Sequence, residues 1–287
     1  MRKGVLYRCR EDRVVICDTC AHRCEIRPGE VGRCGVRSNI GGDLIAEYYG
    51  IISKYEIKKG VSIGITDDED LWFMVGTVGC NFRCSSCRFL DFSYGNLIDY
   101  RDNEQVDPDR LIEDAKLRGL RSIAFGFNEP FVEIEYVLDV FSIAKKQNFK
   151  TAILTNGFFT VEALNLVAPY VDRYVVYVKA FTAHSFKLYT GVSWKSNVVF
   201  ENIGYMLRNN YRVDVATILV PGVNDSVFEI KSLARWILYN MGSGTVWHIF
   251  PFKPTMNMYV YPPMSKEKLI KALDIAVSEG LNRIYLH

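Results

Sequence analysis

Short apolar segments alternate regularly with longer segments of helical character from about residue 72 almost to the end of the chain. This alternation is typical of βα units arranged around a parallel sheet. Six strands of this kind are predicted, followed by a short closing strand at 283–286. The six lie at 71–78, 121–126, 150–155, 173–179, 212–220 and 246–250. Because a closed TIM barrel needs eight strands, six favour a partial (β/α)6 barrel in an α/β fold.

Capping residues support the intervening helices. Asp107, Asp225 and Ser265 are predicted to cap helix N-termini, and Asp107 is followed by a proline that suits the first helical position. Gly119 and Gly280 stand where two of the helices should stop. Helices are therefore expected to begin and end at these positions.

The first 70 residues differ in kind, being rich in Cys, Arg and Gly. A chain of 287 residues with 49% hydrophobic content can bury a large domain and still carry a small appendage. We therefore expect a Cys-rich metal-binding module at 1–70, packed on a barrel domain at 71–287.

Charge and hydropathy restrict the classes of protein. The net charge of +2 is too small to favour DNA or membrane binding through bulk electrostatics. No apolar run approaches the ~18 residues of a membrane span, and the first residues lack the apolar core of a signal peptide. A cytoplasmic protein without membrane attachment is expected. Because the cytoplasm keeps thiols reduced, disulfides are not expected among the eight cysteines, and the seven that fall into two clusters are interpreted as metal ligands.

Three cysteines, Cys80, Cys84 and Cys87, follow the first predicted barrel strand in a Cys-x3-Cys-x2-Cys pattern. Loops at the carboxyl ends of barrel strands build active sites. Three closely spaced thiolates hold three irons of a [4Fe–4S] cluster and leave the fourth iron open for chemistry. The alternative is a set of buried or zinc-binding cysteines without a catalytic role.

Several further motifs occur in a characteristic order along nearly the whole chain. They are Cys17-Asp18-Thr19-Cys20, Gly32-Arg33-Cys34, Asn128-Glu129-Pro130, Thr155-Asn156-Gly157, Lys179-Ala180-Phe181, Val220-Pro221-Gly222-Val223-Asn224-Asp225-Ser226 and Trp247-His248. With the three-cysteine loop, this order resembles radical S-adenosylmethionine (SAM) proteins related to pyruvate formate-lyase activating enzyme. Among these, it resembles the AmmeMemoRadiSam branch. Each motif alone is weak, and their order is more specific.

The resemblance implies an enzyme that reductively cleaves SAM at the [4Fe–4S] cluster of Cys80, Cys84 and Cys87. The resulting 5′-deoxyadenosyl radical would abstract hydrogen from a substrate, for which a protein is expected by analogy with glycyl-radical activases. A reductant such as flavodoxin or ferredoxin is implied as a partner.

The resemblance also implies three SAM-binding residues at the ends of the next three strands. Glu129 would contact the SAM amino group, Asn156 would lie where SAM approaches the backbone, and Lys179 would meet the SAM carboxylate. Taken singly, each residue could instead be a surface or turn residue.

The chain departs from the family pattern near its catalytic loop. The residue before the third cysteine is usually aromatic and packs beside the SAM adenine, whereas here it is Ser86. Phe82 or Phe89 is the expected substitute. A family histidine that contacts SAM is replaced by Lys253, and a family aspartate two positions before Lys179 is replaced by Tyr177.

Four N-terminal cysteines, Cys17, Cys20, Cys24 and Cys34, supply enough thiolates for a tetrahedral zinc site or a second [4Fe–4S] cluster. The spacing does not decide between the two, and a module without metal is the third alternative. Cys9 stands apart and is interpreted as an ordinary thiol.

Two other functions are compatible with the sequence. Residues 1–40 hold nine Lys and Arg against five Asp and Glu, and this excess next to the cysteines favours an enzyme that modifies an RNA base. The other alternative is a non-catalytic iron–sulfur or metal-binding scaffold, which the missing aromatic at Ser86 favours.

Overall fold

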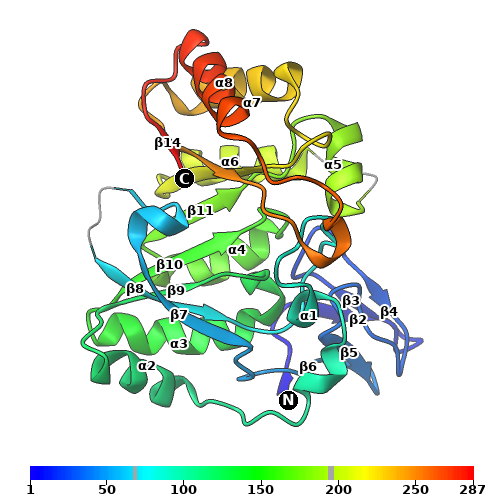
Figure 1. The fold of residues 1–287 in the computed structure, drawn as a ribbon. Coiled ribbons are helices and arrows are strands. Elements are labelled where there is room, and N and C mark those ends of the chain that lie inside the picture. Colours follow the sequence, from blue (N-terminus) through cyan, green and yellow to red (C-terminus); the bar gives the residue numbers. More distant parts are fainter. Residues whose placement is uncertain (67–69, 193–196) are drawn as a thin grey trace.

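The computed structural model describes residues 1–66, 70–192 and 197–287. Its centre is an eight-stranded sheet with the strand order β14-β13-β12-β11-β10-β9-β8-β7, curled into a partial barrel (Figure 1). The strands are β7 (Lys54–Lys59), β8 (Leu71–Gly76), β9 (Ser122–Phe125), β10 (Lys150–Thr155), β11 (Arg173–Tyr177), β12 (Val213–Leu219), β13 (Trp247–Pro251) and β14 (Ile284–Leu286). The predicted α/β partial barrel is confirmed.

Strands β8 to β14 pair in parallel, each with the next along the chain. The six predicted strands and the closing strand are therefore all present. Strand β7 was not predicted as part of this sheet, which it extends by pairing antiparallel with β8. It lies within 1–70, so the sheet begins inside the segment expected to form the N-terminal module, and the division at residue 70 stays a prediction.

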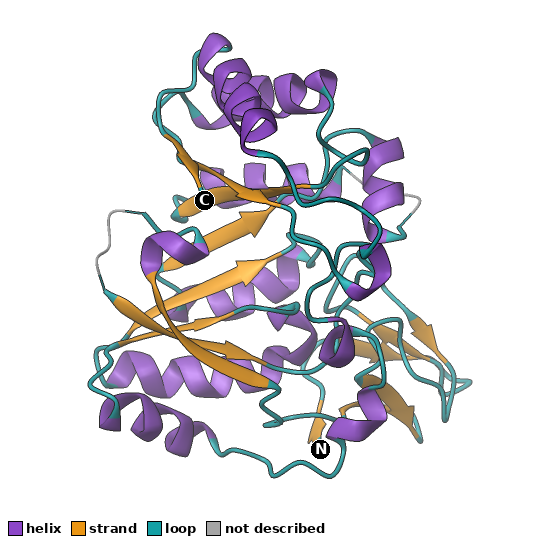
Figure 2. Ribbon diagram, in the orientation of Figure 1, coloured by secondary structure: helices purple, strands orange, loops and turns teal. Residues whose placement is uncertain are grey.

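Helices cover the outer face of the sheet (Figure 2). They are α2 (Pro108–Leu117), α3 (Ile134–Lys146), α4 (Val161–Val167), α5 (Ala183–Thr190), α6 (Val198–Arg208), α7 (Val227–Met241) and α8 (Lys266–Ser278), and a short α1 (Leu90–Ser93) follows the cysteine loop. Ser265 caps α8 as predicted, by accepting a hydrogen bond from the Lys268 amide. The predicted cap at Asp225 is wrong by one residue, because the Ser226 hydroxyl accepts the bond that starts α7.

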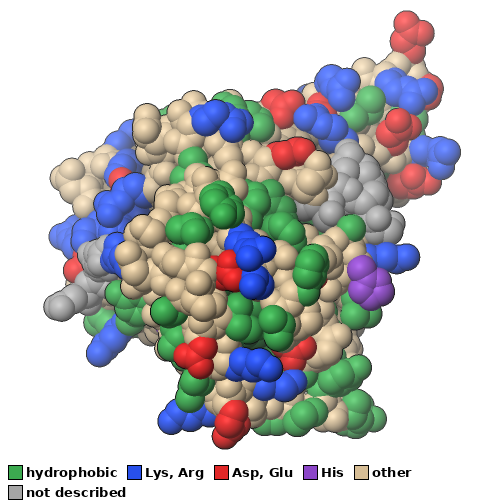
Figure 3. Space-filling model, turned by 90° about the horizontal axis from the view of Figure 1, so that it is seen from above, with side chains coloured by type: hydrophobic (Ala, Val, Ile, Leu, Met, Phe, Trp, Pro, Cys, Tyr) green, Lys and Arg blue, Asp and Glu red, His purple; other side chains and the backbone are tan. Residues whose placement is uncertain are grey.

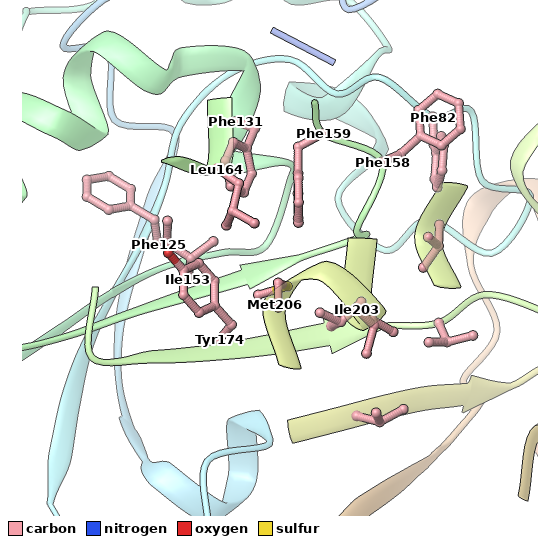
Figure 4. Packing of buried hydrophobic residues seen from close by; sticks show 14 of the residues in the cluster. Phe82, Phe125, Phe131, Ile153, Phe158, Phe159, Leu164, Tyr174, Ile203 and Met206 are labelled. Atoms are coloured by element: carbon pink, nitrogen blue, oxygen red, sulfur yellow. The ribbon is translucent and has the colours of Figure 1, made fainter. Parts of the chain in front are cut away.

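Two layers of buried side chains hold this architecture together. Between sheet and helices, the ring centres of Phe131 and Phe159 lie 4.4 Å apart, and those of Phe82 and Phe158 lie 5.2 Å apart (Figure 4). Inside the curl, Trp72 forms an apolar cluster with residues of the 3-10 turn η1 (Gly60–Ile63) and the segment after it. Each large apolar side chain buried in this way contributes about 1.5–3 kcal/mol.

The N-terminal residues form two small three-stranded sheets beside the carboxyl ends of the barrel strands (Figure 1). One contains β1 (Arg2–Lys3), β6 (Asp43–Ala46) and β5 (Arg37–Ile40), and the other contains β2 (Tyr7–Cys9), β3 (Val15–Cys17) and β4 (Glu25–Ile26). A buried ion pair between Arg37 and Glu135 of α3 joins the first sheet to the barrel, with both side chains at most 2% exposed. Removing one partner would leave the other charge buried and uncompensated, at a cost of about 3–5 kcal/mol.

The molecular surface carries charges of both signs. Seen from the end that carries α7 and α8, Lys and Arg side chains are interspersed with Asp, Glu and hydrophobic ones (Figure 3). This agrees with the small net charge of the chain. Among the described residues, no helix has both the length and the apolar character needed to cross a membrane.

Candidate active site

The loop with Cys80, Cys84 and Cys87 directly follows β8, and all three side chains are partly exposed. Burial raises the pKa of the Cys80 thiol, and the neighbouring charges of Cys84 and Glu129 raise it further. Burial also raises the pKa of Cys84 to about 11, while the charge of Lys179 lowers it. The thiols therefore lie close to one another and to the side chains expected to bind SAM.

Backbone carbonyls of the loop accept hydrogen bonds from side chains of other segments. On the barrel side, the Asn128 side-chain amide donates to the Gly79 carbonyl at 2.7 Å, and the Tyr94 hydroxyl donates to the Cys84 carbonyl at 2.6 Å. On the module side, His22 Nε2 lies 2.9 Å from the Asn81 carbonyl, which can only accept. These bonds fix the backbone of the loop without engaging the thiols, which are the groups that a cluster would need.

Glu129 follows β9 and is 1% exposed. Its carboxylate accepts hydrogen bonds from the Thr155 hydroxyl at 2.8 Å, the Asn156 amide at 2.8 Å and the Phe131 amide at 3.3 Å. Burial raises the pKa of Glu129 to about 7, although these bonds and the charge of Lys179 lower it. Both carboxylate oxygens are thus occupied in tying the end of β9 to the end of β10.

A pH dependence of stability follows from Glu129. Its pKa is about 7 in the folded chain and 4.5 ordinarily, so the folded protein holds more protons between these values. Its contribution to the free energy of unfolding is then fully present below pH 4.5 and lost as pH rises through about 7. We expect denaturant titrations of the metal-free protein to show a steeper loss between pH 5 and 8 for the wild type than for Glu129→Gln. Glu104→Gln, at an exposed position, is the matched control, and equal slopes for all three proteins would contradict the assignment.

Asn156 and Lys179 occupy the ends of the next two strands. The Asn156 side-chain amide donates to Asn81 Oδ1 at 2.6 Å, which connects β10 to the cysteine loop. Lys179 is half-buried, with its ammonium 5.4 Å from the Tyr177 ring centre and 5.9 Å from that of Tyr189. The structure therefore brings the cysteine loop and the three residues expected to bind SAM together, at the carboxyl ends of four adjacent strands.

The structure distinguishes the two expected substitutes for the aromatic residue missing at Ser86. Phe82 is fully buried and packs on Phe158 and Phe186, so it belongs to the core (Figure 4). Phe89 is partly exposed, and its ring lies 5.2 Å from that of Phe127. Phe127 has a positive φ of 67°, a strained conformation for a bulky residue that is most often found at functional sites. Sequence reasoning missed Phe127, since nothing in its local pattern signals this conformation.

His248 lies in the wall of the barrel and is fully buried. Its Nδ1 is 2.9 Å from Nε2 of His287, and burial lowers its pKa to about 4. His248 is therefore a buried residue of strand β13, and nothing in the structure exposes it at the mouth of the barrel. Lys253 is exposed beyond the end of β13.

The four N-terminal cysteines, Cys17, Cys20, Cys24 and Cys34, lie close to one another. Burial raises the pKa of Cys20 well above its ordinary value, and the charges of Cys17, Cys34 and Cys24 raise it further. Burial likewise raises the pKa of Cys34 to about 12. In residues 1–66, 70–192 and 197–287, no group of three His, Cys, Asp or Glu side chains is placed to hold a single metal ion.

Several arginines of the N-terminal module form ion pairs with carboxylates. Arg8 and Arg23 both contact Asp18, and Arg37 is paired with Glu135. Glu135 lies outside residues 1–40 and so offsets one positive charge of the excess that favoured an RNA substrate, whereas Asp18 is already counted among the five carboxylates of that segment.

A cavity of about 600 Å³ opens at the opposite, amino-terminal end of the barrel strands, lined among others by Trp72, Arg173 and Arg212. The cysteine loop lies at the other end of these strands, so the cavity is not part of the site described above.

The family model for the Radical SAM superfamily matches residues 74–236, more than half of the chain. The chain therefore belongs to this superfamily, whose members use a [4Fe–4S] cluster and SAM, and it is an enzyme.

Relatives agree with this assignment. An uncharacterized protein of Methanocaldococcus jannaschii is 27% identical over 292 residues, covering 100% of this chain and 85% of the relative. A putative glycyl-radical enzyme activating enzyme of the same organism is 25% identical, and the match covers 70% of this chain and 75% of that relative. The pyruvate formate-lyase-activating enzyme of Clostridium pasteurianum is 23% identical, and the match covers 74% of this chain and 89% of that enzyme. The chain is thus similar to activating enzymes over most of its length.

A solved structure shows the same fold. The radical SAM methyltransferase from Sphaerobacter thermophilus superposes with a TM-score of 0.59 at 19% identity, covering 76% of this chain and 66% of the other. This likeness supports the partial barrel alone.

Proposed function

We propose that Cys80, Cys84 and Cys87 hold a [4Fe–4S] cluster with which this enzyme reductively cleaves SAM and abstracts a hydrogen atom from its substrate. When bound, the cluster supplies the open iron that chelates SAM and the electron that cleaves its sulfonium bond. The observation that carries the proposal is that the cysteine loop after β8 lies close to Glu129 after β9 and to Lys179 after β11, at the same edge of the sheet.

Three residues at the strand ends, Lys179, Glu129 and Asn156, each have a different proposed role in binding SAM. Lys179 offers a cation to the SAM carboxylate. Glu129 supplies negative charge near the SAM amino group, while its hydrogen bonds hold two strand ends in register. Asn156 positions the cysteine loop through its hydrogen bond to Asn81, at the strand end where SAM is expected to bind.

Electron paramagnetic resonance tests this arrangement. The protein is reconstituted anaerobically with iron and sulfide, reduced, and measured with and without SAM. Chelation of SAM at the open iron predicts a changed spectrum, whereas an unchanged spectrum at saturating SAM would remove the proposed site.

We further propose that the substrate is a protein and that the chain is an AmmeMemoRadiSam-type relative of the glycyl-radical activases, reduced by flavodoxin or ferredoxin. Two relatives named as activating enzymes support the substrate class, and the order of motifs supports the branch. When a deuterated cell extract serves as the source of substrate, deuterium should be incorporated into 5′-deoxyadenosine. This incorporation should be lost if the extract is treated with protease before the assay. Loss of the label after ribonuclease treatment instead would favour the RNA alternative.

For the N-terminal module, proposed to span residues 1–70, we propose zinc or a second [4Fe–4S] cluster at Cys17, Cys20, Cys24 and Cys34. A double substitution, Cys17→Ser with Cys20→Ser, removes two of the four thiolates. We expect the purified variant to lose either one zinc or about four irons relative to the wild type, while the about four irons of the catalytic cluster remain. Quantification of zinc, iron and sulfide distinguishes the two metals, and identical metal contents in both proteins would contradict a site there.

A further inference from the structure

Arg83 lies inside the cysteine loop of Cys80, Cys84 and Cys87, which is called the catalytic loop below because of its proposed role. The Arg83 guanidinium joins two parts of the chain. Nη1 donates to the Cys80 carbonyl at 2.8 Å and to the Phe82 carbonyl at 3.1 Å. Nη2 donates to the carbonyl of Arg33 in the N-terminal module. One side chain thus contacts both the loop with the catalytic cysteines and the residue that precedes Cys34.

Other contacts hold the same two segments together. A Cβ at Gly79 would lie 3.1 Å from the Cys34 carbonyl, so the two backbones are in direct contact beside Cys80. The Arg33 guanidinium donates to the Gly191 carbonyl at 3.0 Å, and Gly191 in turn lies against Arg83. The module is therefore packed on the catalytic loop and not merely tethered to the barrel.

The charge of Arg83 is held close to both sets of cysteines. Its guanidinium lies 5.1 Å from the ring centre of Tyr94 and is only partly exposed. Burial lowers the pKa of Arg83, and the charges of Cys80 and Cys34 act in the opposite direction. A cation this close to thiolate ligands, and partly shielded from water, interacts with them more strongly than a cation at the surface does.

We propose that Arg83 is a positioning residue that couples the N-terminal module to the catalytic loop and raises the reduction potential of the cluster held there. The inference rests on the proposed cluster at Cys80, Cys84 and Cys87. Reduction adds negative charge to a cluster, and a nearby fixed cation favours the reduced form. Rigid hydrogen bonds to the Cys80 and Arg33 carbonyls keep that cation in place.

A redox titration followed by electron paramagnetic resonance tests the charge. Arg83→Gln is neutral but can still donate to a carbonyl, so we expect at least a tenfold fall in the reduced-to-oxidised ratio at a fixed potential. A tenfold change corresponds to about 59 mV for one electron. Arg88→Gln is the matched control, because Arg88 is exposed and directly follows Cys87. It should keep the wild-type potential.

Arg83→Lys separates charge from attachment. It keeps the charge but loses the planar fork, so the potential should stay near that of the wild type. In the metal-free protein, both Arg83 variants should exchange amide hydrogens faster than wild type at 31–36 and 79–84, whereas Arg88→Gln should not.

The outcomes are distinguishable from failure of the proposed function. A wild-type protein without a [4Fe–4S] cluster would refute the proposed function itself. A cluster with equal potentials in Arg83→Gln and wild type, or an equal fall in Arg83→Lys and Arg83→Gln, would overturn only the inference about Arg83. Loss of the cluster from Arg83→Gln but not from Arg83→Lys would support the requirement for a cation.

Discussion

Replacing Cys84 with alanine is expected to reduce the formation of 5′-deoxyadenosine from SAM by at least about a thousandfold. Cys84 is the middle of the three thiolates, and two thiolates alone do not hold three irons of the cluster. The Cys84 carbonyl accepts hydrogen bonds from the Tyr94 hydroxyl and the Cys87 amide, and neither bond involves the side chain, so we expect the fold of the loop to survive its truncation. The variant should therefore be folded and inactive.

Cys9→Ala provides the matched control. Cys9 is exposed, and its thiol lies 3.4 Å from the carbonyl of the neighbouring Arg10, away from the catalytic loop. This variant should form 5′-deoxyadenosine at the wild-type rate under the same anaerobic conditions. Wild-type activity in Cys84→Ala would show that the cluster is held elsewhere.

Gly79→Ala is expected to destabilise the protein by about 2–5 kcal/mol. Gly79 has a φ of +90°, which strains any residue with a side chain. In addition, a Cβ there would lie 2.5 Å from Val36 Cγ1 and 3.1 Å from the Cys34 carbonyl. Backbone strain and overpacking therefore act together at the contact between module and catalytic loop.

Gly29→Ala isolates the strain from the clash. Gly29 has a similar φ of +82°, but a Cβ there would meet no atom within 4 Å beyond its chain neighbours, so its substitution should cost only the strain. Denaturant titration of the two variants under anaerobic conditions gives the difference, and iron content reports on the loop. An equal loss of stability in both would contradict close packing of the N-terminal module on the catalytic loop.

The fold was largely predictable because its signals are local. Each parallel strand is an apolar run followed by a helix, and the strand at 150–155 was predicted with the observed bounds of β10. Strand β7 was missed as part of the barrel because an antiparallel edge strand needs no helix and alternates charged with apolar residues, as Lys54 and Tyr55 do. The cap of α7 was displaced by one residue because Asp225 and Ser226 are both good caps.

The candidate site was predictable only in part. Spacing along the chain is enough to group Cys80, Cys84 and Cys87, whereas the groups that hold their loop come from distant segments. His22 lies 59 residues from Asn81, and Arg33 lies 50 residues from Arg83. Whether Phe82 or Phe89 faces the site also depends on packing between helices and sheet, which the local pattern does not specify.

The central claim is that this chain cleaves SAM at the cysteine loop, and one measurement tests it most directly. The wild-type protein is reconstituted anaerobically, its [4Fe–4S] cluster is reduced, and products of SAM are separated by liquid chromatography with mass detection. We predict 5′-deoxyadenosine and methionine. A protein with an intact, reduced cluster and bound SAM that forms no 5′-deoxyadenosine would contradict the account.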